Sequence, residues 1–440
     1  MLARANDACD KTRALQRTLY RAAKRSGTRR FHALYDKVYR KDILERAWTE
    51  VKKNHGAPGP DGLTIEAIEA YGVDAWLSEI AQDLRGDRYQ AQPVRRVMIP
   101  KRQGGERPLG VPSLRDRLVQ AAVKIVIEPL FEADFLDVSF GFRPRRNAMQ
   151  ARERVRTGIQ RERRRWVVDA DIQSFFDTVD HTVLLRLVRR RISDRRVVKL
   201  IWGWLRVGAL DGAVLRHPVA GTPQGGVLSP LLANIYLHEL DRLWQVRCGT
   251  IGALTRYADD LVITTWKRNQ AERVLRALEE ILHELHLTLG QAKKTRLVNL
   301  AGGEGFDFLG FHYQLVLSRR NRNRTVAMTW PSKSAMAAAR QRIRDLTSPD
   351  QIGLPEIMVV QAVNRFLGGW GAYFRWGNST KQFRALDRFV INRICRSYMA
   401  RKHGWRRKGR GLYELLKSRT RLGLIQLAGT VRYPSAYAAR

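Results

Sequence analysis

The sequence predicts an α+β fold, in which short strands and helices follow one another without a regular βαβ repeat. Three observations support this class. Short strand-like segments lie on either side of turn signals around residues 89–112 and at residues 254–265, a pattern typical of hairpins. Residues 166–172 form a short apolar run, which is typical of a buried strand. The stretch from about 333 to 417 shows helical spacing of its apolar residues.

The remaining elements are expected in a simple order along the chain. Residues 1–54 are basic and predict helices near residues 8–24 and 40–53, before a Gly/Pro-rich break at residues 56–62. After the first hairpin, an apolar helix is predicted over residues 114–132. Leucine and valine alternate with arginine at helical spacing over residues 182–206. A helix over residues 270–286 and short strands to about residue 330 complete the pattern.

The composition indicates a folded protein that binds a polyanion. The 440 residues suggest two or three structural units. With 44% hydrophobic residues, a disordered or collagen-like chain is excluded. No apolar run is long enough to span a bilayer. A formal net charge of +38 attracts polyanions, of which nucleic acid is the most common, and a solvated or membrane-associated surface is the alternative.

The cysteines and the N-terminal residues indicate a reducing compartment. Cys9, Cys248 and Cys395 lie far apart without a CxxC motif, so neither a disulfide framework nor a Cys-based zinc site is expected. The first residues lack the apolar segment of a secretion signal. We therefore expect a cytoplasmic protein with no membrane partner.

Acidic residues within apolar strands are unusual in a chain this basic. Asp259 and Asp260 lie at the predicted hairpin turn, and Asp171 ends the buried strand. If these strands are neighbours, three carboxylates meet at one edge, where their repulsion favours a bound divalent cation. Two Mg²⁺ ions about 4 Å apart would support an in-line phosphoryl displacement. An ordinary Asp-Asp turn is the alternative, and Asp169 competes with Asp171 on the same strand face.

Several segments, in the same order along the chain, resemble reverse transcriptases, most closely those encoded by bacterial group II introns and also called maturases. Residues 257–260 (YADD) are similar to the central motif, residues 171–177 (DIQSFFD) to the first carboxylate motif, and residues 221–230 (GTPQGGVLSP) to the segment between them. The further similar segments are 33–48, 56–64, 107–123, 139–148, 293–298, 306–313 and 364–383.

The resemblance implies a right-hand polymerase, whose fingers and palm with an antiparallel sheet precede a helical thumb and maturase domain. The expected parts are a basic helical N-terminal extension at 1–54, the fingers and palm at 55–315, and the helical thumb or maturase-specific domain at 325–440.

The resemblance also implies the catalytic residues. These are Asp171, Asp259 and Asp260, which would hold two Mg²⁺ ions, or Mn²⁺, together with the carbonyl of Ile172. Phe176 would stack under the incoming sugar and exclude a ribose 2′-hydroxyl, and ordinary core packing is the alternative for this ring.

Four polar residues are expected to contact the incoming nucleotide. Lys101 and Arg107 flank the first hairpin and would bind the triphosphate, with a solvated hairpin as the alternative. Gln224 and Lys294 resemble residues that contact the nucleotide and assist departure of pyrophosphate. Because that last segment is one residue longer than the usual spacing, Lys293 competes with Lys294.

Primer, template and RNA contacts are implied along the second half of the chain. The residues expected at the primer and template are Tyr257, Phe308, Leu309 and Gly310. The residues expected to bind RNA, near interleaved aromatic side chains, are Arg375, Arg384, Arg388 and Arg396.

The sequence therefore predicts an RNA-directed DNA polymerase that binds group II intron RNA, assists its splicing and copies it into DNA during retrohoming. The expected partners are that intron RNA, an RNA template, a DNA primer or target DNA, and dNTPs. The alternatives are a domesticated, defence or repair reverse transcriptase without an intron, and an RNA-binding splicing cofactor whose polymerase activity is dispensable.

Overall fold

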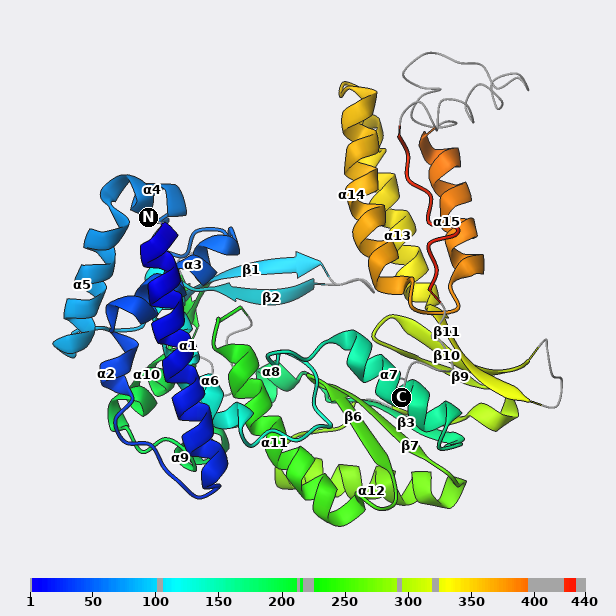
Figure 1. Cartoon of the computed structure of the whole chain (residues 1–440), viewed down its shortest axis with the longest axis horizontal. Helices are drawn as coiled ribbons and strands as arrows, with labels where there is room; N and C mark the ends of the chain where they lie inside the picture. Colours follow the sequence, from blue (N-terminus) through cyan, green and yellow to red (C-terminus); the bar gives the residue numbers. More distant parts are fainter. Residues whose placement is uncertain are drawn as a thin grey trace. The chain divides into compact units, whose positions relative to one another are not determined.

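The computed structural model describes residues 2–100, 106–211, 214–216, 225–290, 295–318, 324–394 and 423–432. These ranges contain helices interspersed with small sheets, which confirms the predicted α+β class (Figure 1). The chain divides into two compact units. Unit 1 consists of Met1–Val155 and Val168–Leu297, and unit 2 of Arg156–Val167 and Val298–Arg440. Within the described ranges, none of the helices has both the length and the apolar character that a membrane-spanning helix requires.

The first part of unit 1 is a group of helices around a buried central helix, α6. Most residues of α6 are buried, because apolar side chains continue around the whole helix and not along one stripe. Helix α3 buries one face, which includes Ile43, Leu44 and Trp48, and it packs with α1 against α6. The bounds are α1 Leu2–Arg25, α2 Tyr35–Val38, α3 Lys41–Lys53, α4 Ile65–Tyr71, α5 Val73–Arg85 and α6 Leu114–Glu132.

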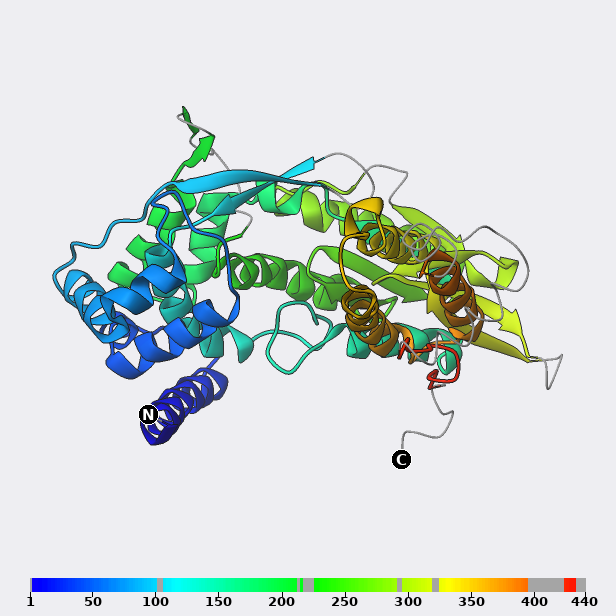
Figure 2. The same ribbon diagram turned by 90° about the horizontal axis from the view of Figure 1, so that it is seen from above.

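A hairpin extends from this helical group. Strands β1 (Val94–Pro100) and β2 (Glu106–Val111) pair antiparallel, which confirms the predicted hairpin. Strands β4 (Ala209–Asp211) and β5 (Val214–Arg216) extend the sheet to the order β2-β1-β4-β5 (Figure 2). The sequence did not predict β4 and β5, because three residues are too few for a periodic pattern to be recognised.

A buried polar network fixes the base of this hairpin. The carboxylate of Asp116, in the first turn of α6, accepts hydrogen bonds from the Tyr89 hydroxyl and, at 3.1 Å, from the N–H of Gln92. The Tyr89 oxygen accepts a bond from the Trp204 indole at 2.9 Å. Burial raises the pKa of both Asp116 and Tyr89. Because a buried polar group is costly without partners, this network holds the residues before β1 against α6.

The second part of unit 1 contains a sheet with the strand order β6-β7-β3-β8. Strands β6 and β7 form the predicted antiparallel hairpin, and β7 is buried after its exposed first residue. Helix α12 packs against β7, and α11 packs against α12. The bounds are α7 Ala148–Gln160, β3 Trp166–Asp171, α8 Phe175–Thr178, α11 Ser229–Cys248, β6 Ala253–Tyr257, β7 Asp260–Thr265, α12 Arg268–Glu284 and β8 Arg296–Asn299.

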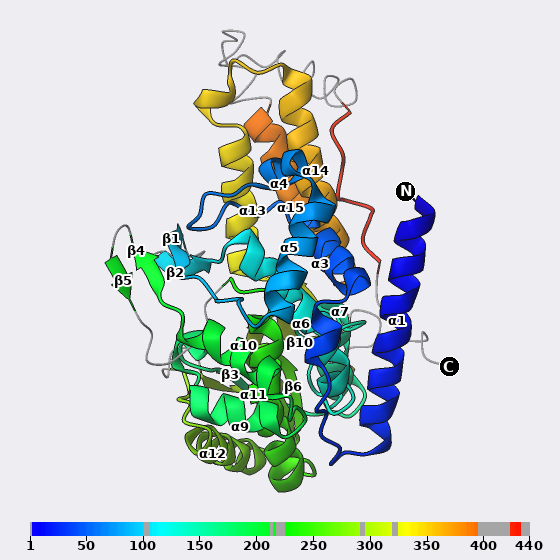
Figure 3. The same cartoon turned by 90° about the vertical axis from the view of Figure 1, so that its left-hand side faces the viewer.

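The predicted helical stretch over residues 182–206 consists of two helices. Helix α9 (His181–Arg189) packs against α10 (Arg195–Arg206) and against α11 (Figure 3). Asp180 and Asp194 are the N-cap residues of α9 and α10, and each side chain accepts two backbone N–H bonds from the first turn of its helix. The helical stretch is therefore interrupted at Asp194, because an N-cap residue has an extended backbone.

In the described residues of unit 2, a three-stranded antiparallel sheet in the order β11-β10-β9 is followed by helices α13, α14 and α15 (Figure 1). Helix α13 packs against both α14 and α15. The described helices agree with the helical pattern predicted for this stretch. The bounds are η1 Leu300–Gly302, β9 Gly305–Phe308, β10 Phe311–Leu317, β11 Thr325–Pro331, α13 Lys333–Leu346, η2 Pro349–Gln351, α14 Glu356–Phe374 and α15 Thr380–Ile391.

Candidate active site

Asp259 and Asp260 lie at the turn between β6 and β7. Tyr257 pairs with Asp260, so Ala258 and Asp259 form a two-residue turn. Ala258 has a φ of 56°, in the left-handed region that residues other than glycine rarely adopt. Asp259 is half-buried and Asp260 is exposed, so neither carboxylate is sealed inside the core.

A fully buried arginine holds this turn. The guanidinium of Arg256 donates to both carboxylate oxygens of Asp241 on α11, at 2.8 and 2.6 Å. It also donates to the side-chain oxygen of Asn234 and to the carbonyl of Ala258, both at 3.1 Å. The rigid fork of arginine donors thus fixes the turn to α11. This role was not predicted from the sequence. An arginine within an apolar strand and an aspartate within an apolar helix are the residue types from which a buried ion pair could have been inferred.

The backbone around Arg256 is paired with residues 138–141. The Arg256 N–H donates to the carbonyl of Val138 at 2.8 Å, and the Arg256 carbonyl accepts from Phe140 at 2.9 Å. A Cβ atom on Gly141 would lie 2.4 Å from the backbone nitrogen of Ala258. Only glycine therefore fits beside the turn, a requirement that the sequence analysis did not identify.

Asp171 is the last residue of β3, the strand next to β7. Its carbonyl accepts a hydrogen bond from the N–H of Gly290 at 2.7 Å, and a Cβ atom on Gly290 would lie 2.9 Å from that oxygen. Ile172 is buried and forms an isolated antiparallel bridge with Leu289. The two hydrogen bonds of the bridge do not use the Ile172 carbonyl, which is the atom predicted to assist metal binding.

The rival acid on β3 has a cationic partner. Arg296 on β8 donates to the Asp169 carboxylate at 3.2 Å. This ion pair joins β3 to β8, and the choice of Asp171 over Asp169 as the functional residue of β3 stays a prediction.

The three predicted catalytic carboxylates are not gathered into a metal site in this structure. Among the described residues, no group of three His, Cys, Asp or Glu side chains is placed to hold a metal ion. Their chemistry suits Mg²⁺, because this ion prefers carboxylate oxygens that also leave room for water and phosphate. The convergence of Asp171, Asp259 and Asp260 on one metal pair therefore stays a prediction.

Phe176 lies in the short helix α8 after β3. Its ring is half-buried and meets the buried ring of Phe175 edge-on, with 5.4 Å between centroids. Phe175 in turn contacts Tyr236 of α11. The ring of Phe176 thus packs against the buried ring of Phe175, and part of its surface is exposed to solvent.

Of the other predicted nucleotide-binding residues, only Arg107 lies within the described part of the chain. Arg107 lies on β2 opposite Ile99. The predicted residues Lys101, Gln224, Lys293, Lys294 and Arg396 lie outside the described residues.

The predicted primer-binding turn is a tight hairpin in unit 2. Phe308 pairs with Phe311, and Leu309 and Gly310 both have positive φ, at 51° and 76°, as a type I′ turn requires. The Tyr373 hydroxyl of α14 donates to the Leu309 carbonyl at 3.0 Å. The turn is therefore fixed to helix α14.

The described arginines of the predicted RNA surface also lie in unit 2. Arg384 and Arg388 are exposed, one helical turn apart on α15, whose opposite face buries Phe383 and Leu386. Arg375, just after α14, lies over the ring of Trp376 at 5.5 Å. These positions leave two guanidinium groups of α15 directed away from the helical core.

Two protein families match this chain. Residues 99–313 match the family described as reverse transcriptase (RNA-dependent DNA polymerase), and residues 336–414 match the group II intron, maturase-specific domain. Protein YkfC of Escherichia coli is 36% identical over an alignment of 320 residues, and the match covers 64% of this chain and 82% of YkfC. The chain belongs to the group II intron reverse transcriptase and maturase family. It is thus an RNA-directed DNA polymerase with a polymerase fold, and its two domains support functions in intron splicing and retrohoming.

Two further similarities are partial. The group II intron-encoded protein LtrA of Lactococcus lactis is 39% identical over 213 residues, 48% of this chain but only 35% of LtrA. A solved telomerase structure from Candida albicans has a TM-score of 0.42 at 13% identity, and covers 79% of this chain and 65% of that one. The reverse transcriptase family generally uses divalent metal ions, and this chain's partners are nucleic acids.

Proposed function

We propose that this reverse transcriptase and maturase forms DNA at the edge of the β6-β7-β3-β8 sheet. The observation that carries the proposal is the turn with Asp259 and Asp260, fixed by buried Arg256 and lying in a hairpin next to the strand that ends at Asp171. If β3 and β7 run antiparallel, the end of β3 lies beside the start of β7. Asp171 would then lie on the same edge of the sheet as Asp259 and Asp260, where we propose that the three carboxylates share metal ions.

Two Mg²⁺ ions, or Mn²⁺, would be held by Asp171, Asp259, Asp260 and the carbonyl of Ile172. When bound, they supply positive charge beside the attacking and leaving oxygens. In the reaction, the primer 3′-hydroxyl loses its proton to water and its oxygen forms a bond to the α-phosphorus of a dNTP. The bond between that phosphorus and the oxygen that bridges to the β-phosphate breaks, and pyrophosphate leaves with this oxygen. The contribution of Arg256 is preorganisation, because the turn is already fixed before substrate arrives.

The nucleotide would be bound by residues around this edge. Phe176 would exclude a ribose 2′-hydroxyl, since its supported ring offers neither space nor a hydrogen-bond partner. The remaining contacts that we propose to the incoming nucleotide are Lys101, Arg107, Gln224 and Lys294. Tyr257 and the turn Phe308-Leu309-Gly310 would contact primer and template.

The C-terminal helices would bind RNA. Exposed Arg384 and Arg388 on α15 support this role, and we also assign Arg375 and Arg396 to it. We propose a three-part organisation with a basic extension at 1–54, fingers and palm at 55–315, and a thumb or maturase domain at 325–440. The substrate would be group II intron RNA, spliced and then copied at a DNA target in the bacterial cytoplasm.

Replacing both turn carboxylates by amides tests the polymerase assignment. The Asp259→Asn/Asp260→Asn protein should lose primer extension on an RNA template by a factor of about 10³ or more, because it loses the charge that the reaction requires. The measurement is DNA-primer extension with Mg²⁺ or Mn²⁺. Asp74→Asn is the matched control, since the Asp74 side chain is 85% exposed on α5. Extension that survives in the double variant would move the active site elsewhere.

A splicing assay tests the intron assignment separately. Adding the protein to the RNA transcribed around its own coding sequence should accelerate release of a spliced product. A protein that extends primers but leaves this RNA unspliced would instead be a reverse transcriptase without an intron.

A further inference from the structure

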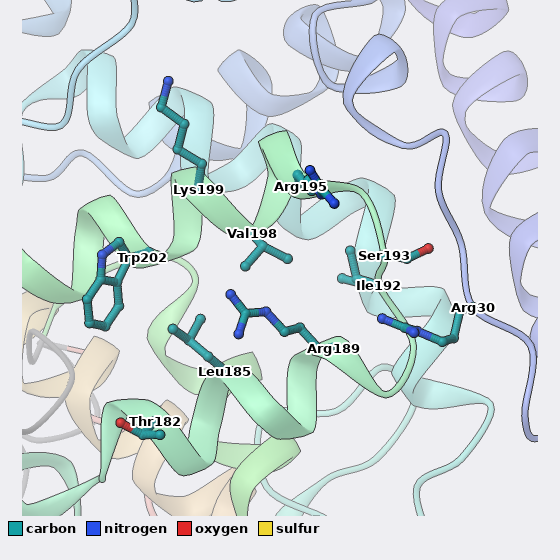
Figure 4. A pocket seen from close by; sticks show the side chains of 10 residues that line it. All are labelled: Arg30, Thr182, Leu185, Arg189, Ile192, Ser193, Arg195, Val198, Lys199 and Trp202. Carbon is teal, nitrogen blue, oxygen red and sulfur yellow. The ribbon is translucent and has the colours of Figure 1, made fainter.

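Unit 1 contains a basic pocket beside helices α9 and α10, formed by residues that the polymerase site does not use (Figure 4). Its volume is about 680 Å³. Four cationic side chains line it, Arg30, Arg189, Arg195 and Lys199, and none of its described lining residues is acidic. We define this as the α9–α10 pocket.

Backbone pairing brings the cations of this pocket together from distant parts of the chain. The N–H of Phe31 donates to the carbonyl of Arg191 at 2.7 Å, and the carbonyl of Phe31 accepts from Ser193 at 2.9 Å. These bonds hold Arg30 beside the loop that joins α9 to α10. Ile192, within that loop, is fully buried, so the loop is anchored from below. The pocket is therefore a built feature of the fold.

The acids nearest to the pocket are already engaged. The Asp194 carboxylate accepts backbone bonds from Leu34 and Tyr35 at 2.9 and 2.8 Å, in addition to capping α10. Asp180 caps α9 and contacts His286 at 2.9 Å. Neither acid forms an ion pair with Arg30, Arg189 or Arg195.

Three of the four cations remain available to a ligand. Lys199 pairs with Asp87 at 2.8 Å, and its ammonium points away from the other labelled side chains (Figure 4). Within the described part of the chain, Arg30, Arg189 and Arg195 form no ion pair. The Arg189 guanidinium reaches between Leu185 and Val198 (Figure 4). Uncompensated arginines that share an anchored pocket attract an anion with several oxygen acceptors.

An aromatic ring completes the pocket. Trp202 is 37% exposed on α10, whereas Trp204 on the same helix is only 4% exposed. Arg206 lies over the Trp202 ring at 5.4 Å, and His181 meets the ring edge-on at 6.2 Å. The indole is thus held in place with a substantial open surface, which suits stacking against a nucleobase.

We propose that the α9–α10 pocket binds an unpaired nucleotide of an RNA strand, with its phosphates on Arg30, Arg189 and Arg195 and its base against Trp202. The volume lies within the range of sites that hold one small ligand, roughly 300–1,000 Å³. The side chains of Thr182 and Ser193 add hydroxyl groups to the lining, where a ribose 2′-hydroxyl could bond. That the ligand is RNA rests on the proposed function. That it has a phosphate and a base is inferred from the side chains of the pocket itself.

The test is binding of a fluorescently labelled RNA stem–loop to the full-length protein over a series of salt concentrations. In Arg189→Ala/Arg195→Ala, affinity should fall about tenfold or more, because charge-assisted contacts to phosphate are lost. The slope of log affinity against log salt should flatten by about 1.4, at about 0.7 for each single-strand phosphate. Arg186→Ala/Arg276→Ala is the matched control, since it removes two exposed arginines of unit 1 that do not line the pocket.

The base contact has its own variants. Trp202→Ala should weaken binding of the stem–loop about five- to 100-fold, and Trp202→Phe should retain most of the affinity, because stacking needs an aromatic face. A fully paired RNA duplex should bind all these proteins alike. Thermal unfolding of each variant checks that the fold is kept.

Each outcome bears on one proposal. If the pocket and control double variants bind equally, the arginines do not contact RNA. If Trp202→Ala binds as well as wild type, the base assignment is wrong. If DNA of the same sequence binds with the same sensitivity to these variants, the assignment to RNA is wrong. A wild-type protein that binds no RNA at all would overturn the proposed function as well.

Discussion

Arg256 lies within the hairpin that carries the predicted catalytic acids, and its side chain has no exposed surface. Its ion pair with Asp241 is equally inaccessible to water. Such a pair adds little net stability compared with an apolar pair of similar shape, but losing one partner leaves a buried charge alone. We therefore expect stability to be more sensitive to substitution of Arg256 than of Asp259 or Asp260, the predicted catalytic acids of the same hairpin.

We expect Arg256→Ala to lower the free energy of unfolding by roughly 3–5 kcal/mol, since Asp241 would lose its partner inside the core. Urea unfolding of purified protein measures this. The matched control is Arg268→Ala, whose arginine is 69% exposed and pairs with Glu272, and which should cost at most about 1 kcal/mol. Equal losses for the two variants would show that the network around the turn is not important for stability.

At the scale of elements, helix α9 is joined to α11 through one carboxylate. Glu239 on α11 accepts hydrogen bonds from Arg190, at the end of α9, and from Arg242. Burial alone would raise the pKa of Glu239, but the bonds from Arg242 and Arg190 outweigh burial and lower it to about 2. The junction therefore keeps its charge at neutral and mildly acidic pH.

This junction gives the fold a defined acid sensitivity. Because the pKa of Glu239 is lower in the folded state than its ordinary value of 4.5, its contribution to stability is present above pH 4.5 and is lost as the pH falls towards 2. Urea midpoints measured across that pH range should fall more steeply for wild type than for Glu239→Gln. Parallel pH profiles of the two proteins would contradict this assignment.

The contact between the 138–141 loop and the β6–β7 turn predicts a change in activity. Gly141→Ala places a Cβ atom 2.4 Å from the Ala258 nitrogen, so the turn that carries Asp259 must move. We expect primer extension to fall about tenfold or more, because small displacements of catalytic groups are costly. Initial rates on an RNA template measure this loss.

Gly203→Ala is the matched control for that substitution. The nearest atom to a Cβ atom at Gly203 lies 3.9 Å away, inside helix α10. Alanine should stabilise this helix by about 0.5–1 kcal/mol and leave primer extension unchanged. If both alanine variants extend primers like wild type, the loop does not position the turn.

At the scale of the whole molecule, the net charge of +38 sets how affinity depends on salt. Binding to RNA should weaken steeply as salt rises, because each neutralised phosphate releases counterions. Replacing Arg384 and Arg388 by alanine should weaken binding about equally across RNA sequences. It should also flatten the salt slope by about 1.4 if both contact single-stranded phosphates. Filter binding in a salt series measures this, and an unchanged slope would exclude α15 from the RNA surface.

Most of the fold could be predicted from the sequence, because its signals are local. The hairpins of β1 with β2 and of β6 with β7 follow from short strand-like segments on either side of a turn, and α3 and α12 follow from one apolar face. The break at Asp194 is a capping effect that needs the three-dimensional contacts of its side chain. Strands β4 and β5 were missed because the pairing of β4 with β1 and of β5 with β4, and not their own sequence pattern, defines them.

The candidate site was predictable in its residue types and only partly in its geometry. The sequence indicates that Asp259 and Asp260 are at a turn and that Asp171 ends a strand. It does not reveal that Arg256 and Gly141 hold that turn, because their partners are distant in sequence. The gathering of three carboxylates depends on side-chain rotation and on ions, which a pattern of residues does not encode.

The strand order β6-β7-β3-β8 has a consequence for folding during translation. Strand β3 has one neighbour that begins at Asp260 and another that begins at Arg296, so it waits for partners translated long after it. Pairing over such separations is slow, because a long loop must close first. The nascent chain consequently carries its basic N-terminal helices well before it can complete the β6-β7-β3-β8 sheet.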